Sequence, residues 1–281
     1  MRVVRTIADL RALLRPLRGE GKRIGFVPTM GFLHEGHGAL IRQSAARCDA
    51  TVVSIFVNPT QFGPSEDLAS YPRDLERDQN LCLEAGATVL FLPDDSEIYP
   101  TGFQTHVEPG RLSDSLCGRF RPGHFRGVTT VVVKLFNMVQ PDLAVFGEKD
   151  FQQLLVIRRM TEDLCLPVSI LGVPTVRESD GLAMSSRNGY LSPEERAIAP
   201  AVERCLQEAA TALRAGGAAE AVERATVLGL DQAGLRPDYV AVRRALDLGE
   251  VGPTDRELVI LAAAWLGPAR LIDNLRVTRP N

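Results

Sequence analysis

The strongest constraint on the fold of this chain is a regular alternation of short apolar runs with longer stretches that have helical spacing. Apolar runs of strand length, each closed by Pro, Gly or Asn, occupy residues 24–27, 51–57, 88–92, 143–146 and 169–173. Helical spacing recurs between them at residues 36–48, 73–85, 128–139 and 151–163. This alternation predicts βαβ units, and therefore a Rossmann-like parallel sheet with helices on both faces and ligands at the carboxyl ends of the strands.

The pattern changes after about residue 175. Val202, Leu206, Ala209 and Leu213 form an apolar stripe on one long helix. Strands are then predicted, between Gly and Pro turns, at residues 239–242, 258–265 and 270–272. We therefore expect two domains, a Rossmann-like domain over residues 1–175 that binds the substrates and a smaller C-terminal α+β domain over residues 176–281.

Composition narrows the class of function. The 281 residues are 45% hydrophobic and 24% charged, with a net charge of −3, which is typical of a globular protein and disfavours nucleic acid or anionic membranes as partners. The five cysteines are scattered without a CxxC pair, so neither a disulfide framework nor a zinc site is expected. Neither a signal peptide nor a membrane-spanning run is recognisable, which predicts a cytoplasmic protein that acts on small molecules.

The first candidate site lies at residues 28–37, where a predicted strand leads into a predicted helix. His34 and His37 are three residues apart, so they lie on one turn at the helix start, where backbone N–H groups and the helix dipole attract anions. Gly31 and Gly36 allow the backbone to approach a ligand closely. A single histidine near a helix cap is usually an ordinary polar residue, but two of the four histidines share this turn. The segment is therefore a candidate polyphosphate site.

Three further segments place polar side chains at strand ends or in a loop. Asn58 and Gln61 follow the second strand, and their amides suit hydroxyl and carboxylate groups. Lys149 follows the fourth strand and offers a cation to an anionic substrate. Ser185 and Arg187 belong to a loop suited to a triphosphate, in which Arg187 can stabilise charge on leaving pyrophosphate. Taken singly, each segment is better explained as a turn, a solvated charge cluster or an ordinary loop.

Together and in order, these segments closely resemble the pantothenate synthetase family of the HIGH/KMSKS nucleotidyltransferase superfamily. Residues 34–37 are similar to the HIGH element, and residues 184–188 are similar to the KMSKS element. The resemblance extends over residues 24–192 and includes the strings at 71–73, 121–125, 134–137 and 176–178. Phe32, Gly38 and Thr60 depart from the family pattern, which puts local packing in question at positions that are not proposed to be catalytic.

The resemblance implies a two-step ligase reaction. The carboxylate of pantoate attacks the α-phosphate of ATP to give pantoyl adenylate and pyrophosphate, and β-alanine then displaces AMP to form pantothenate. The family's catalytic positions correspond to His37, His34, Lys149 and Arg187, with His37 as a proton donor. Gln61 and Gln153 would bind pantoate, and Gln61 would also contact β-alanine.

The resemblance also implies the remaining ligands and partners. The ATP-binding residues would be Met30, Gly31, Phe32, Leu33, His34, Glu35, Gly36, His37, Gly147, Glu148, Lys149, Asp150, Val176, Met184, Ser185, Ser186 and Arg187. Mg²⁺ would accompany ATP, bound mainly by nucleotide oxygens and water, and its protein ligands stay unassigned. The loop at residues 185–187 is expected to close over ATP as a lid, and the resemblance implies a homodimer.

Two alternatives stay open. Another adenylyl or cytidylyl transferase of the same superfamily would share the histidine turn, but it would not be expected to share Gln61 and Gln153. A non-catalytic nucleotide-binding or RNA-binding module would have to keep both the histidine turn and the Ser-Ser-Arg loop without turnover. The near-neutral charge also disfavours RNA.

Overall fold

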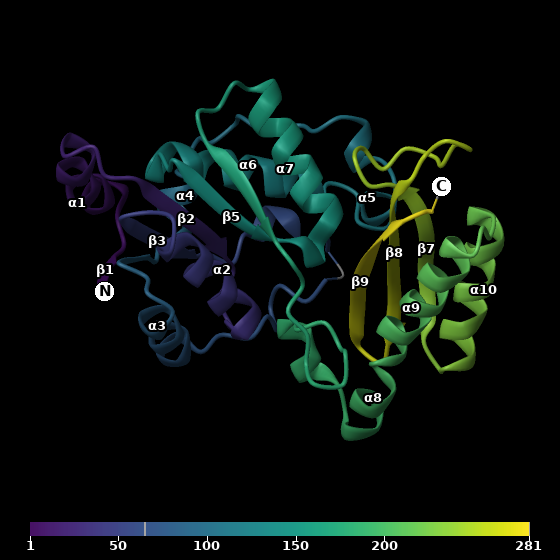
Figure 1. Cartoon of the computed structure of the whole chain (residues 1–281). Coiled ribbons are helices and arrows are strands. Elements are labelled where there is room, and N and C mark those ends of the chain that lie inside the picture. Colours follow the sequence, from purple (N-terminus) through teal and green to yellow (C-terminus); the bar gives the residue numbers. More distant parts are fainter. Residues whose placement is uncertain (65, 281) are drawn as a thin grey trace. The chain divides into compact units, whose positions relative to one another are not determined.

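The computed structural model describes residues 1–64 and 66–280, and the chain divides into two compact units (Figure 1). Unit 1 comprises Met1–Ser113, Arg121–Glu148 and Gln153–Pro174. Unit 2 comprises Asp114–Phe120, Lys149–Gln152 and Thr175–Asn281. Two short segments, residues 114–120 and 149–152, therefore belong to the same unit as the C-terminal part of the chain.

A six-stranded sheet in the spatial order β1-β4-β3-β2-β5-β6 forms the centre of unit 1. Its strands are β1 Arg2–Val4, β2 Ile24–Thr29, β3 Ala50–Ile55, β4 Val89–Phe91, β5 Leu143–Gly147 and β6 Ser169–Val173. All the pairings between neighbouring strands are parallel. From β2, the strands β3 and β4 follow one another toward one edge of the sheet, where β1 also lies. The strands β5 and β6 follow on the other side of β2, so the strand order reverses between β2 and β5. Open α/β sheets bind their ligands at such a reversal, at the carboxyl ends of the strands.

Helices cover both faces of this sheet. They are α1 Ile7–Gly19, α2 Glu35–Ala45, α3 Leu75–Glu84, α4 Asp95–Ile98, α6 His124–Val139 and α7 Phe151–Asp163. Successive strand residues point to opposite faces, so Phe26 packs with Val132 of α6 in one core, whereas Val27 packs with Ile41 of α2 and Cys82 of α3 in the other. The predicted Rossmann-like fold with helices on both faces is thereby confirmed.

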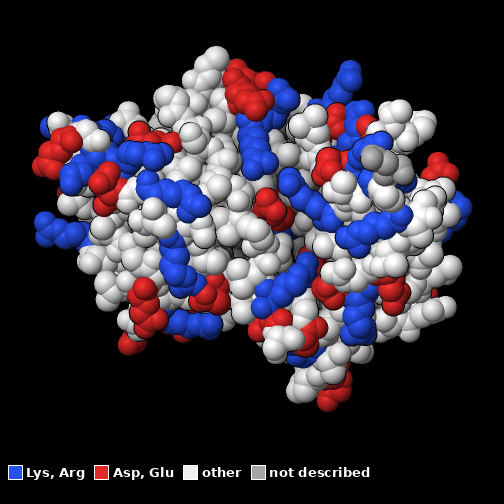
Figure 2. Space-filling model, viewed as in Figure 1, with Lys and Arg blue, Asp and Glu red and all other residues white. Residues whose placement is uncertain are grey.

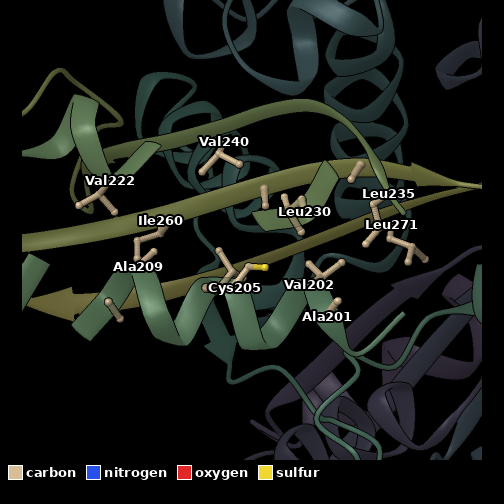
Figure 3. Close-up of a cluster of buried hydrophobic side chains, with 14 of the residues drawn as sticks. Ala201, Val202, Cys205, Ala209, Val222, Leu230, Leu235, Val240, Ile260 and Leu271 are labelled. Carbon is tan, nitrogen blue, oxygen red and sulfur yellow. The ribbon is translucent and has the colours of Figure 1, made fainter. Parts of the chain in front are cut away.

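Unit 2 has its own core between helices and an antiparallel sheet. Its larger elements are α8 Pro193–Ile198, α9 Ala201–Arg214, α10 Ala219–Gln232, β7 Arg236–Arg244, β8 Glu257–Leu266 and β9 Ala269–Thr278. The strands pair in the order β7-β8-β9. Figure 3 shows the cluster in which Val202 and Cys205 of α9 and Leu230 of α10 meet Ile260 and Leu271 of the sheet. The predicted small α+β domain is therefore also confirmed.

Short elements connect these larger ones and carry several of the predicted site residues. They are η1 Pro59–Gln61, η2 Arg111–Ser113, α5 Cys117–Phe120, η3 Glu148–Asp150 and η4 Ser186–Tyr190. In the part of the chain that the structure describes, no helix combines the length and the apolar character needed to span a membrane. The five cysteines are free thiols, as expected from their scatter.

The thiols should differ widely in reactivity. Cys165 is exposed, whereas Cys82 is fully buried in the core beneath α3, and burial raises the pKa of the Cys82 thiol to about 12. Because the thiolate is the nucleophile, we expect N-ethylmaleimide at pH 8 to modify Cys165 rapidly and Cys82 only after unfolding. Peptide mass mapping of native and urea-unfolded samples measures this order. Equal rates at the two positions in the native protein would contradict the buried placement of Cys82.

Candidate active site

The chain leaves β2 through a strained turn that a buried carboxylate holds in place. Gly31 and Phe32 both have left-handed backbone conformations, with φ of 86° and 50°, which for a residue other than glycine costs about 1–2 kcal/mol. The carboxylate of Asp78 in α3 is buried and accepts the N–H groups of Phe32 at 2.8 Å and of Leu33 at 2.6 Å. Burial raises the pKa of Asp78, and these two bonds partly offset that rise. Asp78 therefore anchors the turn that precedes α2.

The two histidines form a reciprocal cap at the start of α2. His34 Nδ1 accepts the N–H of Gly36 at 3.2 Å, and His37 Nδ1 accepts the N–H of His34 at 3.3 Å. The rings are 4.2 Å apart between centroids. Because Nδ1 is an acceptor in both neutral rings, the ring proton is assigned to Nε2 in each. The arrangement supplies two imidazole Nε2–H donors at a helix N-terminus, where the helix dipole favours an anion.

Gln61 is held in one orientation within unit 1. Its Oε1 accepts Asn58 Nδ2 at 3.0 Å, and its Nε2 donates to the Met30 sulfur at 3.1 Å. Asn58 is 1% exposed and its Oδ1 accepts the Tyr99 hydroxyl at 2.7 Å and the Thr60 hydroxyl at 2.9 Å. These bonds assign the oxygen and nitrogen ends of both amides. The structure thus brings the predicted pantoate ligand Gln61 into contact with the predicted ATP ligand Met30.

A second set of contacts fixes the backbone of Gln61. His124 Nδ1 donates to the Gln61 carbonyl at 2.9 Å, while His124 Nε2 lies 3.1 Å from Nη1 of Arg121. Arg121 can only donate, so His124 carries its proton on Nδ1. The Arg121 guanidinium also makes two bonds to the Glu66 carboxylate, at 2.8 and 2.6 Å. The string at residues 121–125, noted above for its family resemblance, therefore supports Gln61.

The remaining predicted site residues of unit 1 are Gly147, Glu148 and Gln153. Gly147 ends β5, which pairs with β2 on the side opposite β3, and Glu148 follows it directly. Gln153 is half-buried on α7. The adjacent Gln152 has a structural role, because its amide accepts the Cys117 N–H at 3.0 Å and donates to the Ser115 carbonyl at 2.8 Å.

The other predicted site residues belong to unit 2. Lys149 and Ser185 line one small hollow, together with Asn188 and Asp273. The hydroxyl of Ser185 caps η4 by accepting the Arg187 N–H at 3.3 Å. Unit 2 also contains Asp150, Val176, Met184, Ser186 and Arg187.

Polar residues of β9 connect two of these segments. The guanidinium of Arg177 bonds the Asp273 carboxylate twice, at 2.6 and 3.0 Å, and donates to the Gly181 carbonyl at 3.0 Å. Asn274 donates its own N–H to Asp273 Oδ1 at 2.8 Å and its side-chain amide to the Lys149 carbonyl at 2.9 Å. Both Asp273 and Asn274 are buried.

Charged side chains of both signs are interspersed on the surface of the protein (Figure 2). Figure 2 shows one face of the protein, on which Lys and Arg side chains alternate with Asp and Glu side chains. Among residues 1–64 and 66–280, no group of three or more His, Cys, Asp or Glu side chains is arranged to hold a metal ion.

Several supporting residues were not predicted from the sequence. Asn58 was predicted, from its position at a strand end, as an amide suited to hydroxyl and carboxylate groups, but not as the residue that orients Gln61. Asp78 lies 45 residues beyond Leu33, and Asp273 lies 96 residues beyond Arg177. Nothing in the local pattern of either aspartate points to such distant partners.

Comparison with known proteins gives consistent matches over the whole chain. The family model described as pantoate-beta-alanine ligase matches residues 2–276. A pantothenate synthetase from Pseudomonas aeruginosa strain UCBPP-PA14 is 58% identical over 280 residues, which cover 99% of each chain. The crystal structure of pantothenate synthetase from Thermus thermophilus superposes with a TM-score of 0.94 at 48% identity, covering 100% of both chains.

A third similar protein has a crystal structure that is described with bound ligands. It is a crystal structure of pantoate-beta-alanine ligase from Francisella tularensis, described as complexed with beta-gamma ATP and beta-alanine. That protein is 33% identical, with a TM-score of 0.83 and coverage of 98% of this chain and 97% of its own.

The contact between α6 and η1 yields a stability prediction. A methyl group at Gly127 would lie 2.4 Å from the Thr60 carbonyl oxygen and 2.7 Å from Gln61 Cα. Alanine is the better helix former, by about 1 kcal/mol, yet the backbone collision should make Gly127→Ala less stable by about 1–3 kcal/mol. Urea unfolding measures the change. The matched control is Gly229→Ala in α10, where the new methyl meets Cys205 Sγ at 3.3 Å. A Gly127→Ala protein as stable as this control would contradict the packing.

Proposed function

The chain belongs to the pantoate-beta-alanine ligase family, and from this premise we propose that it condenses pantoate with β-alanine, using ATP and passing through a pantoyl adenylate. The family is one of acid–amine ligases, and the chain is an enzyme of that class. One observation supports the chemistry most directly. The histidine pair presents two Nε2–H donors at the start of α2, at the strand reversal where such sheets bind nucleotides.

In the first proposed step, the pantoate carboxylate forms a bond to the α-phosphorus of ATP. The bond from that phosphorus to the oxygen bridging to the β-phosphate breaks, and pyrophosphate leaves with the electron pair. Negative charge accumulates on the leaving group, so positioned donors and cations stabilise the transition state. We assign this role to His34, His37, Lys149 and Arg187, with His37 as the proton donor.

In the second step, the β-alanine nitrogen forms a bond to the acyl carbon of the adenylate. The bond between that carbon and the phosphate oxygen breaks, AMP leaves, and the amine loses a proton. Activation is needed because a free carboxylate has no adequate leaving group, whereas AMP leaves readily. We assign Gln61 and Gln153 to the binding of pantoate and Gln61 to β-alanine. The oriented amide of Gln61 supports its part, because its rigid placement lowers the entropy lost on reaching the transition state.

We propose that the ATP site comprises the residues set out by the family resemblance, including residues 30–37, 147–150, Val176 and 184–187. Residues 185–187 act as a lid over ATP in this proposal. Mg²⁺ bound with ATP would supply further charge neutralisation on the phosphates, mainly through phosphate oxygens and water.

Pyrophosphate exchange separates this function from its alternatives. Labelled pyrophosphate should enter ATP only when pantoate is present, and omission of β-alanine should not prevent it. Exchange supported by a phosphorylated substrate in place of pantoate would instead identify an adenylyl or cytidylyl transferase. Binding of ATP without exchange or pantothenate formation, at saturating pantoate, β-alanine and Mg²⁺, would indicate a non-catalytic module.

Substitution of the two main donors should slow the reaction without unfolding the protein. We expect His37→Ala and Lys149→Ala each to lower kcat by about 10²–10³-fold, because each removes one donor or cation from the developing charge. His37→Gln keeps a side chain at N3 that can complete the helix cap, so its slower turnover would separate catalysis from capping. AMP release measures kcat, and thermal unfolding monitors the fold.

His106→Ala and Lys22→Ala are the matched controls, because both side chains are exposed and outside the proposed site. Near-wild-type rates in either test variant would remove that residue from the mechanism.

We also propose, from the family resemblance, that the enzyme is a cytoplasmic homodimer. Light scattering of the purified full chain should give twice the chain mass of 30.6 kDa, and a monomer mass at the concentrations used for assay would contradict the dimer.

A further inference from the structure

A buried polar network in unit 2 joins three segments that are distant in sequence. Arg177 begins the segment that leads to Ser185, Asp273 and Asn274 lie in β9, and Lys149 lies in η3. Arg177 bonds Asp273 twice, Asp273 accepts the N–H of Asn274, and the Asn274 amide donates to the Lys149 carbonyl. The chain of contacts therefore runs without interruption from Arg177 to Lys149. We refer to Arg177, Asp273 and Asn274 as the β9 clamp.

Hydrogen bonds also hold together the segment between Arg177 and the Ser-Ser-Arg loop. Arg177 pairs with Ala183 in an isolated bridge, and the Met184 N–H donates to the Val176 carbonyl at 3.0 Å. Further along, the Asn188 side-chain amide donates to the Ala183 carbonyl at 3.1 Å. A displacement of Arg177 is therefore transmitted to residues 184–188, because these bonds leave the intervening backbone little freedom.

The burial of the β9 clamp indicates a geometric role. The Asp273 side chain is 2% exposed and that of Arg177 is 24% exposed. A buried ion pair adds little net stability, since desolvation offsets the attraction, but a bidentate guanidinium–carboxylate pair fixes distance and orientation closely. The hollow lined by Lys149, Ser185 and Asp273 lies beside this pair. Asp273 thus lines the same hollow as Lys149, which carries a cationic group, and Ser185, which carries a hydroxyl group.

We propose that Arg177, Asp273 and Asn274 are positioning residues that hold Lys149 at a set distance from the segment 185–187, so that both act on the phosphate chain of ATP. The inference rests on the proposed function, in which these two segments stabilise the leaving pyrophosphate. It implies that the β9 clamp serves adenylation much more than aminolysis, because pyrophosphate departs in the first step and has left before the amine attacks.

Three variants separate positioning from folding. Asp273→Asn keeps the side-chain shape and removes the charge, and Arg177→Lys keeps the charge but cannot make the bidentate contact. The double variant Arg177→Met/Asp273→Leu replaces the buried pair by apolar side chains, an exchange that often preserves stability. Arg243→Lys is the matched control, because Arg243 pairs with Glu223 at 2.8 Å in the same unit and lies outside the hollow.

Two partial reactions provide the activity readout. Pantoate-dependent pyrophosphate exchange reports adenylation, and aminolysis of supplied pantoyl adenylate by β-alanine reports the second step. We expect each variant of the β9 clamp to slow exchange on the order of 100-fold, as small displacements of positioning groups do, and to raise the KM for ATP. Aminolysis should stay within about twofold of wild type by the same argument, and Arg243→Lys should leave both steps unchanged.

Amide hydrogen exchange on the substrate-free protein tests the β9 clamp without any turnover. Faster exchange is expected in the variants at residues 149–152 and 183–188, but not in α9. Unchanged exchange there, or equal slowing of both partial reactions in a folded variant, would overturn the proposed role. A wild-type protein without pantoate-dependent pyrophosphate exchange would instead overturn the proposed function, and the hydrogen exchange would still report on the β9 clamp.

Discussion

Burial of β2 on both faces, between β3 and β5, is the constraint on which the proposed site of unit 1 depends. Phe26 and Val27 enter different cores, so the strand can neither rotate nor slip by one residue without moving apolar side chains to the wrong face. The chain must then leave β2 at the carboxyl edge of the sheet, where the strand order reverses. The turn, the start of α2 and the histidine pair occupy that place for this reason.

Buried polar side chains then shape the backbone around the predicted ligands. Asp78 holds the strained turn at Phe32, and Asn58 sets the orientation of Gln61. Each of these groups is removed from water and satisfied by specific partners, so a change in geometry would leave a buried polar atom without its bond. A buried carboxylate has a similar role in unit 2, where Asp273 accepts hydrogen bonds from Arg177 and from the N–H of the adjacent Asn274. Such buried hydrogen bonds make a site rigid before its ligand binds, which reduces the reorganisation required during the reaction.

The chemistry that follows from this rigidity is electrostatic. Acyl activation by ATP needs no covalent nucleophile from the protein, because the substrate carboxylate attacks the phosphorus itself. What the protein supplies is placement of the acid and stabilisation of charge on the leaving group. The Nδ1 contacts of His34 and His37 contribute to this, since they place both ring protons on Nε2.

The sequence by itself determined the fold class and the order of its principal elements, because the apolar periodicities of a buried strand and of a helix are local properties of the chain. It missed β1, α1 and α10. It predicted β9 as residues 270–272 rather than Ala269–Thr278, because Asp273 and Asn274 interrupt the apolar pattern there. Strings such as residues 34–37 and 184–188 also identified the family. Only the tertiary structure decided how the predicted residues are supported. The partners of Asp78 and Asp273 lie tens of residues away, and a hydrogen bond between distant segments depends on how the chain folds back on itself, which local composition does not record.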